Sequence, residues 1–507
     1  MRASRIGTSS LLCLSCVVLA LGCETPPPAV DGGGLVPDDG GTMPDSATTP
    51  DGGTMPGHDG GSMPGTQVTY TPVGCSYEVR SPTVIDARLS ADVFGASPTT
   101  DHVHVSWSAA TDSTMTVIWR SDTDTLASSV LIGTDQAAVM AADGASTGVT
   151  RQDGHAMLYS SATSGAGAER IHEVHVCGLS PDTTYYYRVG GPGHWSAVFD
   201  YSTGPAAGAT TPWTFGVTGD SRGSDLTSPP GDNAWALAQH RLHDRATEFE
   251  VFTGDGVFLG SSQPLWNTWF EGMDGAFTVQ DYTARHPLMM SNGNHDLLSI
   301  NYLAQFAMPQ EQSTGELADG EEWYSFDYAN AHFVVLNDTT TSAGTIAGAE
   351  ATWLEADLSA VNRTTTPWIF VVHHQSLYTC GSGGAHAPDA TARTAWQPIF
   401  DAHHVDFVLA GHNHFYQRSY PIRGIDTVAA HAASGAPTIS SGDPSGTIYV
   451  VAGGAGAPFY GVGTCPQIQV GMAVRNYMTF EITNRTVTMT AYDTLTNAVI
   501  DTITYTK

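Results

Sequence analysis

The stretch Pro-Leu-Met-Met-Ser-Asn-Gly-Asn-His-Asp at residues 287–296 joins a short apolar run to a turn that carries amide, imidazole and carboxylate groups. Four other segments share this design, with polar side chains placed directly after an apolar run that predicts a buried strand. They are Gly219-Asp220, Gly254-Asp255, His373-His374 and Gly411-His412-Asn413-His414, and the five predicted strands span residues 213–217, 249–253, 287–290, 368–372 and 405–409. Because open α/β sheets bind ligands at the carboxyl ends of parallel strands, we expect these groups to converge on one rim of one sheet. Oxygen donors mixed with imidazoles suit first-row metal ions, and two ions that share a carboxylate can promote phosphoryl chemistry.

The order and spacing of the five segments resemble those of the calcineurin-like metallophosphoesterases over residues 211–475. Two further patterns are similar to purple acid phosphatases in particular. The last segment continues as Phe415-Tyr416-Gln417-Arg418-Ser419, and the helix pattern of residues 351–354 leads into residues 368–372 and His374. The resemblance implies a four-layer αββα catalytic domain over residues 208–507, including a C-terminal β segment, with two metal ions of the types Fe, Zn or Mn.

The resemblance also implies six metal ligands, one of which is shared between the two ions. Asp255 is the shared ligand. Asp220 and His414 would bind the first ion, and Asn294, His374 and His412 would bind the second. The neighbouring His373 is the alternative to His374. His374 has the spacing from Trp368 and Tyr378 that the family's ligand shows, so the resemblance favours His374, and we expect His373 to be a structural neighbour.

Three more residues are expected to act on the substrate. By the same resemblance, His295 would donate to the transition-state oxygens, and Asp296 would orient its imidazole as a carboxylate behind a histidine does. His386 lies in the glycine-rich loop of residues 381–386 and would protonate the leaving alcohol. The alternative for His386 is an exposed loop residue without a role.

Two positions depart from the family pattern. Purple acid phosphatases place an iron-binding Tyr three residues after the shared Asp, where this chain has Phe258. The other common ligand is a His two residues after the first Asp, where this chain has Arg222. The first metal is thus short of one ligand, which water, a backbone group or Asp225 could supply. Arg222 is instead a candidate for substrate binding, because its planar fork matches phosphate oxygens.

The region before the catalytic domain is predicted to be an all-β sandwich. Over residues 69–207, apolar residues alternate at Val103, Val105 and Trp107, and residues 179–185 are similar to the corner before a late strand of a fibronectin type III domain. A Tyr hydroxyl at such a corner bonds back to the backbone, which assigns that role to Tyr185. Plant-type purple acid phosphatases carry a similar sandwich in front of their catalytic domain.

The beginning of the chain has the pattern of an export signal. Residues 1–23 combine a basic start with an apolar segment too short to span a bilayer, and they end in Ala-Leu-Gly-Cys, which resembles a bacterial lipobox. We therefore expect lipidation at Cys23, or otherwise an ordinary export signal cleaved nearby. Residues 24–68 are rich in Gly, Pro and Asp and predict a disordered linker. The expected location is extracytoplasmic, as a cell-envelope lipoprotein or a secreted protein.

Four cysteines remain beyond the signal and the lipidation site. An even number in an exported protein indicates disulfides, and the sequence alone allows three pairings of the four. Locality within domains favours Cys75–Cys177 and Cys380–Cys465, and buried free thiols are the alternative.

The net charge and the motifs together indicate which classes of function fit this protein. The net charge of −31, with only 19 Lys and Arg residues, argues against electrostatic binding of nucleic acid or anionic lipid, so any membrane contact would come from the lipid anchor. We expect a phosphatase that hydrolyses phosphate monoesters, either small molecules or phosphoproteins, by attack of a metal-bound hydroxide. The alternatives are a phosphodiesterase or nucleotidase of the same fold, or a surface binding lipoprotein with a degenerate site.

Overall fold

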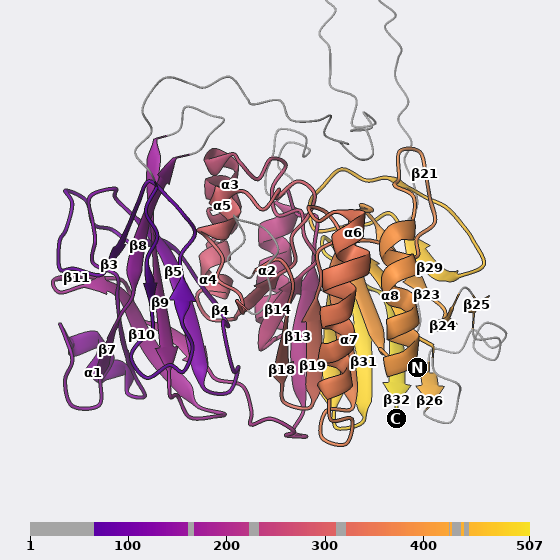
Figure 1. The fold of residues 1–507 in the computed structure, drawn as a ribbon, viewed down its shortest axis with the longest axis horizontal. Coiled ribbons are helices and arrows are strands. Elements are labelled where there is room, and N and C mark those ends of the chain that lie inside the picture. Colours follow the sequence, from indigo (N-terminus) through magenta and orange to yellow (C-terminus); the bar gives the residue numbers. More distant parts are fainter. Residues whose placement is uncertain are drawn as a thin grey trace, which may run out of the picture. The chain divides into compact units, whose positions relative to one another are not determined.

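The computed structural model describes most of the chain from residue 65 onward (Figure 1). The described residues are 65–160, 167–222, 233–310, 321–424, 426–427, 438–440 and 446–507, with 426–427 and 438–440 described by their backbone alone. The predicted signal, nearly all of the predicted linker, Cys23 and Asp225 therefore lie outside the described residues. Within the part of the chain that is described, no helix is long and apolar enough to cross a membrane.

The region up to residue 202 is built from two five-stranded antiparallel sheets. The first has the order β3 (Asp86–Leu89), β8 (His155–Ser160), β9 (Ala168–Cys177), β5 (Thr114–Ser121) and β4 (Asp101–Ser106). The second has the order β11 (His194–Trp195), β10 (Thr184–Gly191), β6 (Ser129–Gly133) and β7 (Thr150–Asp153), with β12 (Phe199–Ser202) also on β10. The strands β1 (Thr69–Tyr70) and β2 (Val79–Arg80) pair with each other, and α1 is Gln136–Ala141.

Alternating residues of the two sheets fill a common core, so this region is a sandwich. Val103 and Val105 of β4 pack in one cluster with Val130 and Ile132 of β6, all nearly or fully inaccessible to solvent. At the predicted corner, the backbone N–H of Ser180 donates to the Tyr185 hydroxyl at 2.9 Å. The prediction of an all-β N-terminal domain is therefore confirmed, including its tyrosine corner.

The region after residue 207 contains two seven-stranded sheets. The first has the order β17 (Leu288–Met290), β14 (Phe249–Phe252), β13 (Trp213–Thr218), β30 (Asn476–Thr483), β31 (Thr486–Asp493), β32 (Val499–Thr506) and β26 (Thr438–Ser440). The second has the order β18 (Tyr324–Tyr328), β19 (Ala331–Val335), β20 (Trp368–Gln375), β22 (Phe407–Gly411), β27 (Ile448–Ala452), β23 (Tyr416–Ser419) and β29 (Ile468–Met472). Small pairs complete the strands: β15 (Met273–Asp274) with β16 (Phe277–Thr278), β21 (Gly381–Ser382) with β28 (Gly461–Val462), and β24 (Ile422–Arg423) with β25 (Asp426–Thr427).

Helices cover the outer faces of these sheets and give the predicted four layers. Leu242 of α2 (Ala234–Asp244) lies against Gly216 of β13 on the outer face of the first sheet. Helices α7 (Ala351–Ala360) and α8 (Ala390–His403) pack on the second sheet (Figure 1). The remaining helices are α3 (Gln263–Phe270), α4 (Val279–Thr283), α5 (Ile300–Leu303), α6 (Ala343–Thr345) and the π-helix η1 (Ile346–Glu350).

The five polar segments do not meet on one sheet, and that prediction is wrong. Strands β13, β14 and β17 belong to the first sheet, whereas β20 and β22 belong to the second. Their carboxyl ends come together because the sheets pack face to face, with the Phe215 ring 5.1 Å from Phe370. All five strands are buried on both faces, so their apolar runs do not reveal which sheet each one joins.

The sandwich also binds the catalytic domain directly. The Ser106 hydroxyl of β4 donates to the carbonyl of Ala307 at 2.6 Å, and the Val103 N–H donates to the Gln280 side chain at 2.9 Å. Trp107 lies in the same apolar cluster as Phe249 of β14, with ring centroids 5.2 Å apart. The sandwich therefore supplies part of the catalytic domain's core.

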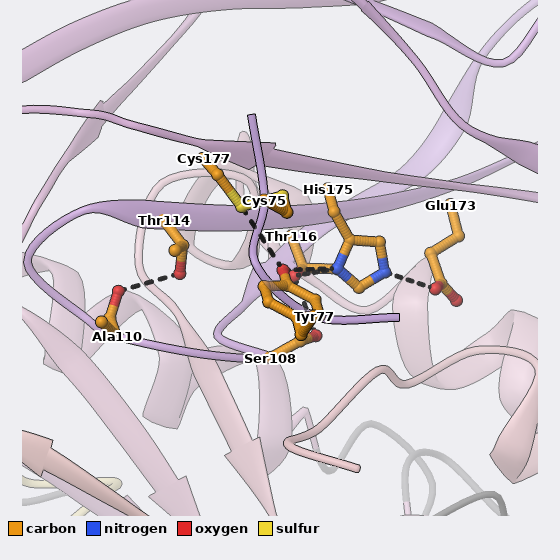
Figure 2. Close-up of a disulfide and its surroundings, with 9 residues drawn as sticks. All are labelled: Cys75, Tyr77, Ser108, Ala110, Thr114, Thr116, Glu173, His175 and Cys177. Carbon is orange, nitrogen blue, oxygen red and sulfur yellow. Dashed lines mark hydrogen bonds and ion pairs between the residues drawn. A yellow bond between two sulfur atoms is a disulfide. The ribbon is translucent and has the colours of Figure 1, made fainter. Parts of the chain in front are cut away.

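One of the two predicted disulfides is present. Cys75 is bonded to Cys177 at the end of β9, beside Tyr77, whose hydroxyl lies 3.0 Å from the His175 Nδ1 (Figure 2). Cys380 and Cys465 are free thiols, so the second predicted pair is wrong. Their loops are neighbours, since the Gly463 N–H donates to the Cys380 carbonyl at 2.8 Å. Proximity alone does not make a disulfide, which requires a specific arrangement of both side chains.

Acid should weaken the sandwich through its buried histidines. His172 lies between the hydroxyls of Ser121 and Ser128, at 2.7 and 2.8 Å, and burial lowers its pKa to about 3. Since this value is below the unfolded value of about 6.5, the stability contributed by the neutral ring is complete above pH 6.5 and falls as the pH drops towards 3. The loss is about 1.4 kcal/mol per pH unit. We expect the free energy of unfolding of His172→Gln, measured in urea, to change less between pH 7 and 4.5 than that of the wild type. Equal changes would contradict the assignment.

Candidate metal centre

Two aspartates and one histidine form a buried group at the ends of β13, β14 and β22. Asp220, Asp255 and His414 each offer a ligand atom within 4.8 Å of the others, and each is at most 1% exposed. The Asp255 Oδ2 atom is buried and has no hydrogen-bond partner among the described residues. A buried carboxylate oxygen without a partner is costly, and a cation would remove that cost. The group therefore fits a metal ion.

The backbone is strained around this group. Asp220 and Asp255 both have positive φ, at 53° and 59°, a conformation that residues other than glycine rarely adopt. Glycine is required at two neighbouring positions. A Cβ at Gly254, whose φ is 92°, would lie 2.6 Å from the His374 ring, and one at Gly411 would lie 2.3 Å from the Asp220 carboxylate. Strain of this kind gathers at functional sites, where the surrounding fold holds it in place.

A second group of predicted ligands lies next to Asp255. The His374 Nε2 is 3.0 Å from the Asn294 Oδ1 and 3.3 Å from the Asp255 Oδ1, and its Nδ1 donates to the Thr253 carbonyl at 2.8 Å. The His412 ring lies edge-on to His374, with centroids 5.1 Å apart. Metal-binding histidines commonly hold their second nitrogen on a carbonyl in this way. The structure thus brings together all six predicted ligands.

The buried carboxylates of the centre favour a bound cation. Burial raises the pKa of Asp220 to about 8. Burial would lower the pKa of His374, but Asp255 and Asp220 raise it to about 10, and His374 in turn holds the pKa of the buried Asp255 well below its usual range. Protons therefore balance the carboxylates as long as no other cation does. A metal ion would compete for the same atoms and release those protons on binding.

His373 points away from this centre. Its Nδ1 lies 2.8 Å from the Asp338 Oδ2, and its ring packs edge-on against Trp396 of α8, with centroids 5.5 Å apart. Strand β20 runs through both histidines, so successive side chains lie on opposite faces. This geometry separates the two imidazoles, and only His374 lies beside Asn294 and Asp255.

Asp296 does not lie behind His295, and the predicted orienting contact is wrong. Its carboxylate accepts the backbone N–H groups of Gly293, Asp255 and Gly256, at 2.9, 2.9 and 3.0 Å. The carbonyl of Phe258 bonds to the His295 Nδ1 instead, at 2.6 Å. Asp296 therefore ties two ligand-bearing turns together. Sequence adjacency to His295 could not show this, because two of the three donors, Asp255 and Gly256, come from a different loop.

His386 lies over the candidate metal centre. Its ring stacks on His412, with centroids 3.9 Å apart, and its backbone N–H donates to the Asn413 side chain at 2.9 Å. The side chain is half-buried, which disagrees with the exposed-loop alternative. Arg222 also reaches the centre, where its Nη2 lies 2.8 Å from the His295 Nε2.

Tyr460 is a site residue that the sequence did not reveal. Its ring stacks on His414 at 4.2 Å, and its hydroxyl lies 3.3 Å from the His386 Nε2. The neighbouring Pro458 carbonyl bonds to the His414 Nδ1 at 2.6 Å. This loop follows β27 and is not one of the five polar segments, so no motif marks it. The only signal is that it follows a strand of the second sheet.

Comparisons with known proteins agree with this geometry. Residues 100–203 match the family model of the purple acid phosphatase N-terminal domain, and residues 224–416 match that of the calcineurin-like phosphoesterases. A purple acid phosphatase of Glycine max is 30% identical over 341 residues, which cover 62% of this chain and 67% of that protein. The chain belongs to the purple acid phosphatase family.

Another relative of this purple acid phosphatase family member matches over a smaller share of both chains. Purple acid phosphatase 21 of Arabidopsis thaliana is 31% identical over 299 residues, and the matched region spans 57% of this chain and 58% of that protein. The solved structure of a purple acid phosphatase from yellow lupin (Lupinus luteus) seeds superposes with a TM-score of 0.66 over 81% of this chain and 74% of that one. At 17% sequence identity, that likeness supports the fold alone.

The role of Asp296 in this purple acid phosphatase family member can be tested by Asp296→Asn. An amide cannot accept all three backbone N–H groups as well as a carboxylate does, so we expect a loss of about 1–3 kcal/mol in the free energy of unfolding. Metal content, measured by elemental analysis, should fall with it. Asp244→Asn, at an exposed aspartate at the end of α2, is the control. A variant with unchanged stability and a shifted pH profile of activity would show that Asp296 acts through His295.

Proposed function

We propose that this chain is an extracytoplasmic phosphatase that hydrolyses phosphate monoesters with the help of two metal ions. The single observation that carries the proposal is the buried group of Asp220, Asp255 and His414, in which one carboxylate oxygen has no partner among the described residues. Membership of the purple acid phosphatase family supports the same reaction. The substrates would be small phosphate esters or phosphoproteins.

The six ligands divide into two sets that share Asp255. The first ion would be held by Asp220, Asp255 and His414, and the second by Asp255, Asn294, His374 and His412. Bound metal ions supply an activated nucleophile and neutralise charge on the phosphoryl oxygens. The mixture of carboxylate, amide and imidazole donors suits Fe, Zn or Mn.

The first set lacks a fourth protein ligand in the positions where the family provides one. The Phe258 ring has no donor atom, and the Arg222 guanidinium is a cation. Tyr460 packs its ring flat on His414. We therefore expect the first ion to be held less tightly than the second.

Protonation of the leaving alcohol is assigned to His386. Its imidazole stacks on His412, and its Nε2 is paired with the Tyr460 hydroxyl at 3.3 Å. A group that can hold a proton at this place is suited to general acid catalysis. Tyr460 would keep the ring facing the centre.

Removal of the shared carboxylate tests the reaction. Asp255→Ala should deplete both ions and abolish hydrolysis of 4-nitrophenyl phosphate, with metal content measured by elemental analysis. Asn294→Ala should mainly weaken the second site and recover part of its activity in excess metal. Bis(4-nitrophenyl) phosphate, assayed in parallel, distinguishes a monoesterase from a diesterase. Full activity of Asp255→Ala at trace metal would refute the two-metal proposal.

The proposed location depends on the lipobox-like segment before Cys23. Cys23→Ser should move the protein from the membrane fraction to the soluble fraction, because the residue that would carry the lipid is gone. Specific activity should stay unchanged, since the catalytic residues lie about 200 residues further along the chain. Fractionation of cells that produce each form is the measurement. A variant that remained in the membrane fraction would rule out this anchor.

A further inference from the structure

The guanidinium of Arg222 is a buried cation beside the metal centre. The residue is 3% exposed, and its Cζ lies 5.2 Å from the centre of the Phe258 ring. Its Nη2 bonds to the His295 Nε2 at 2.8 Å, and its backbone N–H donates to the Asp255 carbonyl at 3.3 Å. The Nε and Nη1 atoms are buried and have no hydrogen-bond partner among the described residues. The single N–H of Nε and the two N–H groups of Nη1 are thus left available on a fixed cation.

The hydrogen bonds of His295 define its tautomer. The Phe258 carbonyl can only accept, so the His295 Nδ1, 2.6 Å away, carries the proton. The guanidinium can only donate, so the His295 Nε2 presents its lone pair to Arg222. Both ring nitrogens are therefore engaged. His295 has no free N–H to offer a phosphoryl oxygen in this arrangement.

We propose that Arg222, and not His295, donates hydrogen bonds to the phosphoryl oxygens, and that His295 and Phe258 are positioning residues for its guanidinium. This inference rests on the proposed phosphoesterase function. The planar fork of an arginine matches two oxygens of a phosphate, and such charge-assisted pairs are strong. The Phe258 ring supports the face of the guanidinium, and His295 fixes one of its edges.

A fixed cation at the position of Arg222 would attract a negatively charged substrate. The chain has a net charge of −31, which opposes the approach of an anionic ester. A buried arginine with unpartnered N–H groups lowers that local barrier through its positive charge. Its backbone N–H bonds to the Asp255 carbonyl, and the Asp255 Oδ2 has no hydrogen-bond partner among the described residues, so the guanidinium does not occupy that ligand atom.

Binding of inorganic phosphate, measured as competitive inhibition of 4-nitrophenyl phosphate hydrolysis and by calorimetry, tests the proposal. Arg222→Gln should bind phosphate about 10- to 100-fold more weakly, the effect of losing a hydrogen bond to a charged group. Its metal content should equal that of the wild type. Arg222→Lys keeps the charge without the fork and should recover only part of the affinity. It also serves as the second variant if Arg222→Gln does not fold.

Variants of His295 distinguish positioning from direct donation. His295→Gln keeps an oxygen that can accept from Arg222, so it should retain more phosphate affinity than His295→Ala. The pH profile of kcat should be the same in His295→Gln and the wild type. His295→Ala should add nothing in an Arg222→Gln background.

Several results would overturn the proposal. They are wild-type phosphate affinity in Arg222→Gln, loss of metal from that variant, or an equal loss in both His295 variants with a shifted pH profile. Phosphate binding that depends on Arg222 in a protein that hydrolyses no ester would refute the proposed function and leave this inference intact.

Discussion

The contact between the two large sheets is the constraint on which the site depends. Phe215 of β13 stacks on Phe480 at 4.8 Å and meets Phe333 and Phe370 of the other sheet edge-on, at about the same distance of 5.1 Å. Aromatic pairs bury much area and prefer defined geometries, so they fix how one sheet lies on the other. The ends of β13 and β14 are thereby held opposite the ends of β20 and β22. Without this packing, the two carboxylates and the imidazoles would belong to separate surfaces.

Several features of the metal centre are energetically unfavourable, and the rest of the fold must offset their cost. Asp220 and Asp255 are buried, adopt left-handed backbone conformations and lie close to one another. Each of these features costs free energy in a protein without a bound cation. The backbone N–H groups on Asp296 and the bond from His374 to the Thr253 carbonyl hold the turns in spite of that cost. The site is therefore pre-organised for a cation rather than formed by one.

The sequence predicted the local parts of this arrangement well. The strands follow from apolar runs along one segment, and the choice of His374 over His373 follows from the spacing that the family shows in that segment. The structure departs from prediction where the answer depends on a second, distant segment. Examples are the partition of strands between sheets, the donors bound by Asp296, the free thiols of Cys380 and Cys465, and the place of Tyr460. Arg222 shows the same limit, because its partners Phe258 and His295 come from two other loops.

The contacts of the sandwich have a consequence for how the chain unfolds. Ser106 and His104 of β4 bond to the carbonyls of Ala307 and Gln305, in the segment that follows the His295 turn. Removing the sandwich would leave those carbonyls, and the apolar side chains that pack against Trp107, exposed to water. We therefore expect both regions to melt in a single cooperative transition. A boundary near residue 207 divides the sequence, whereas the smallest independently stable piece extends across it.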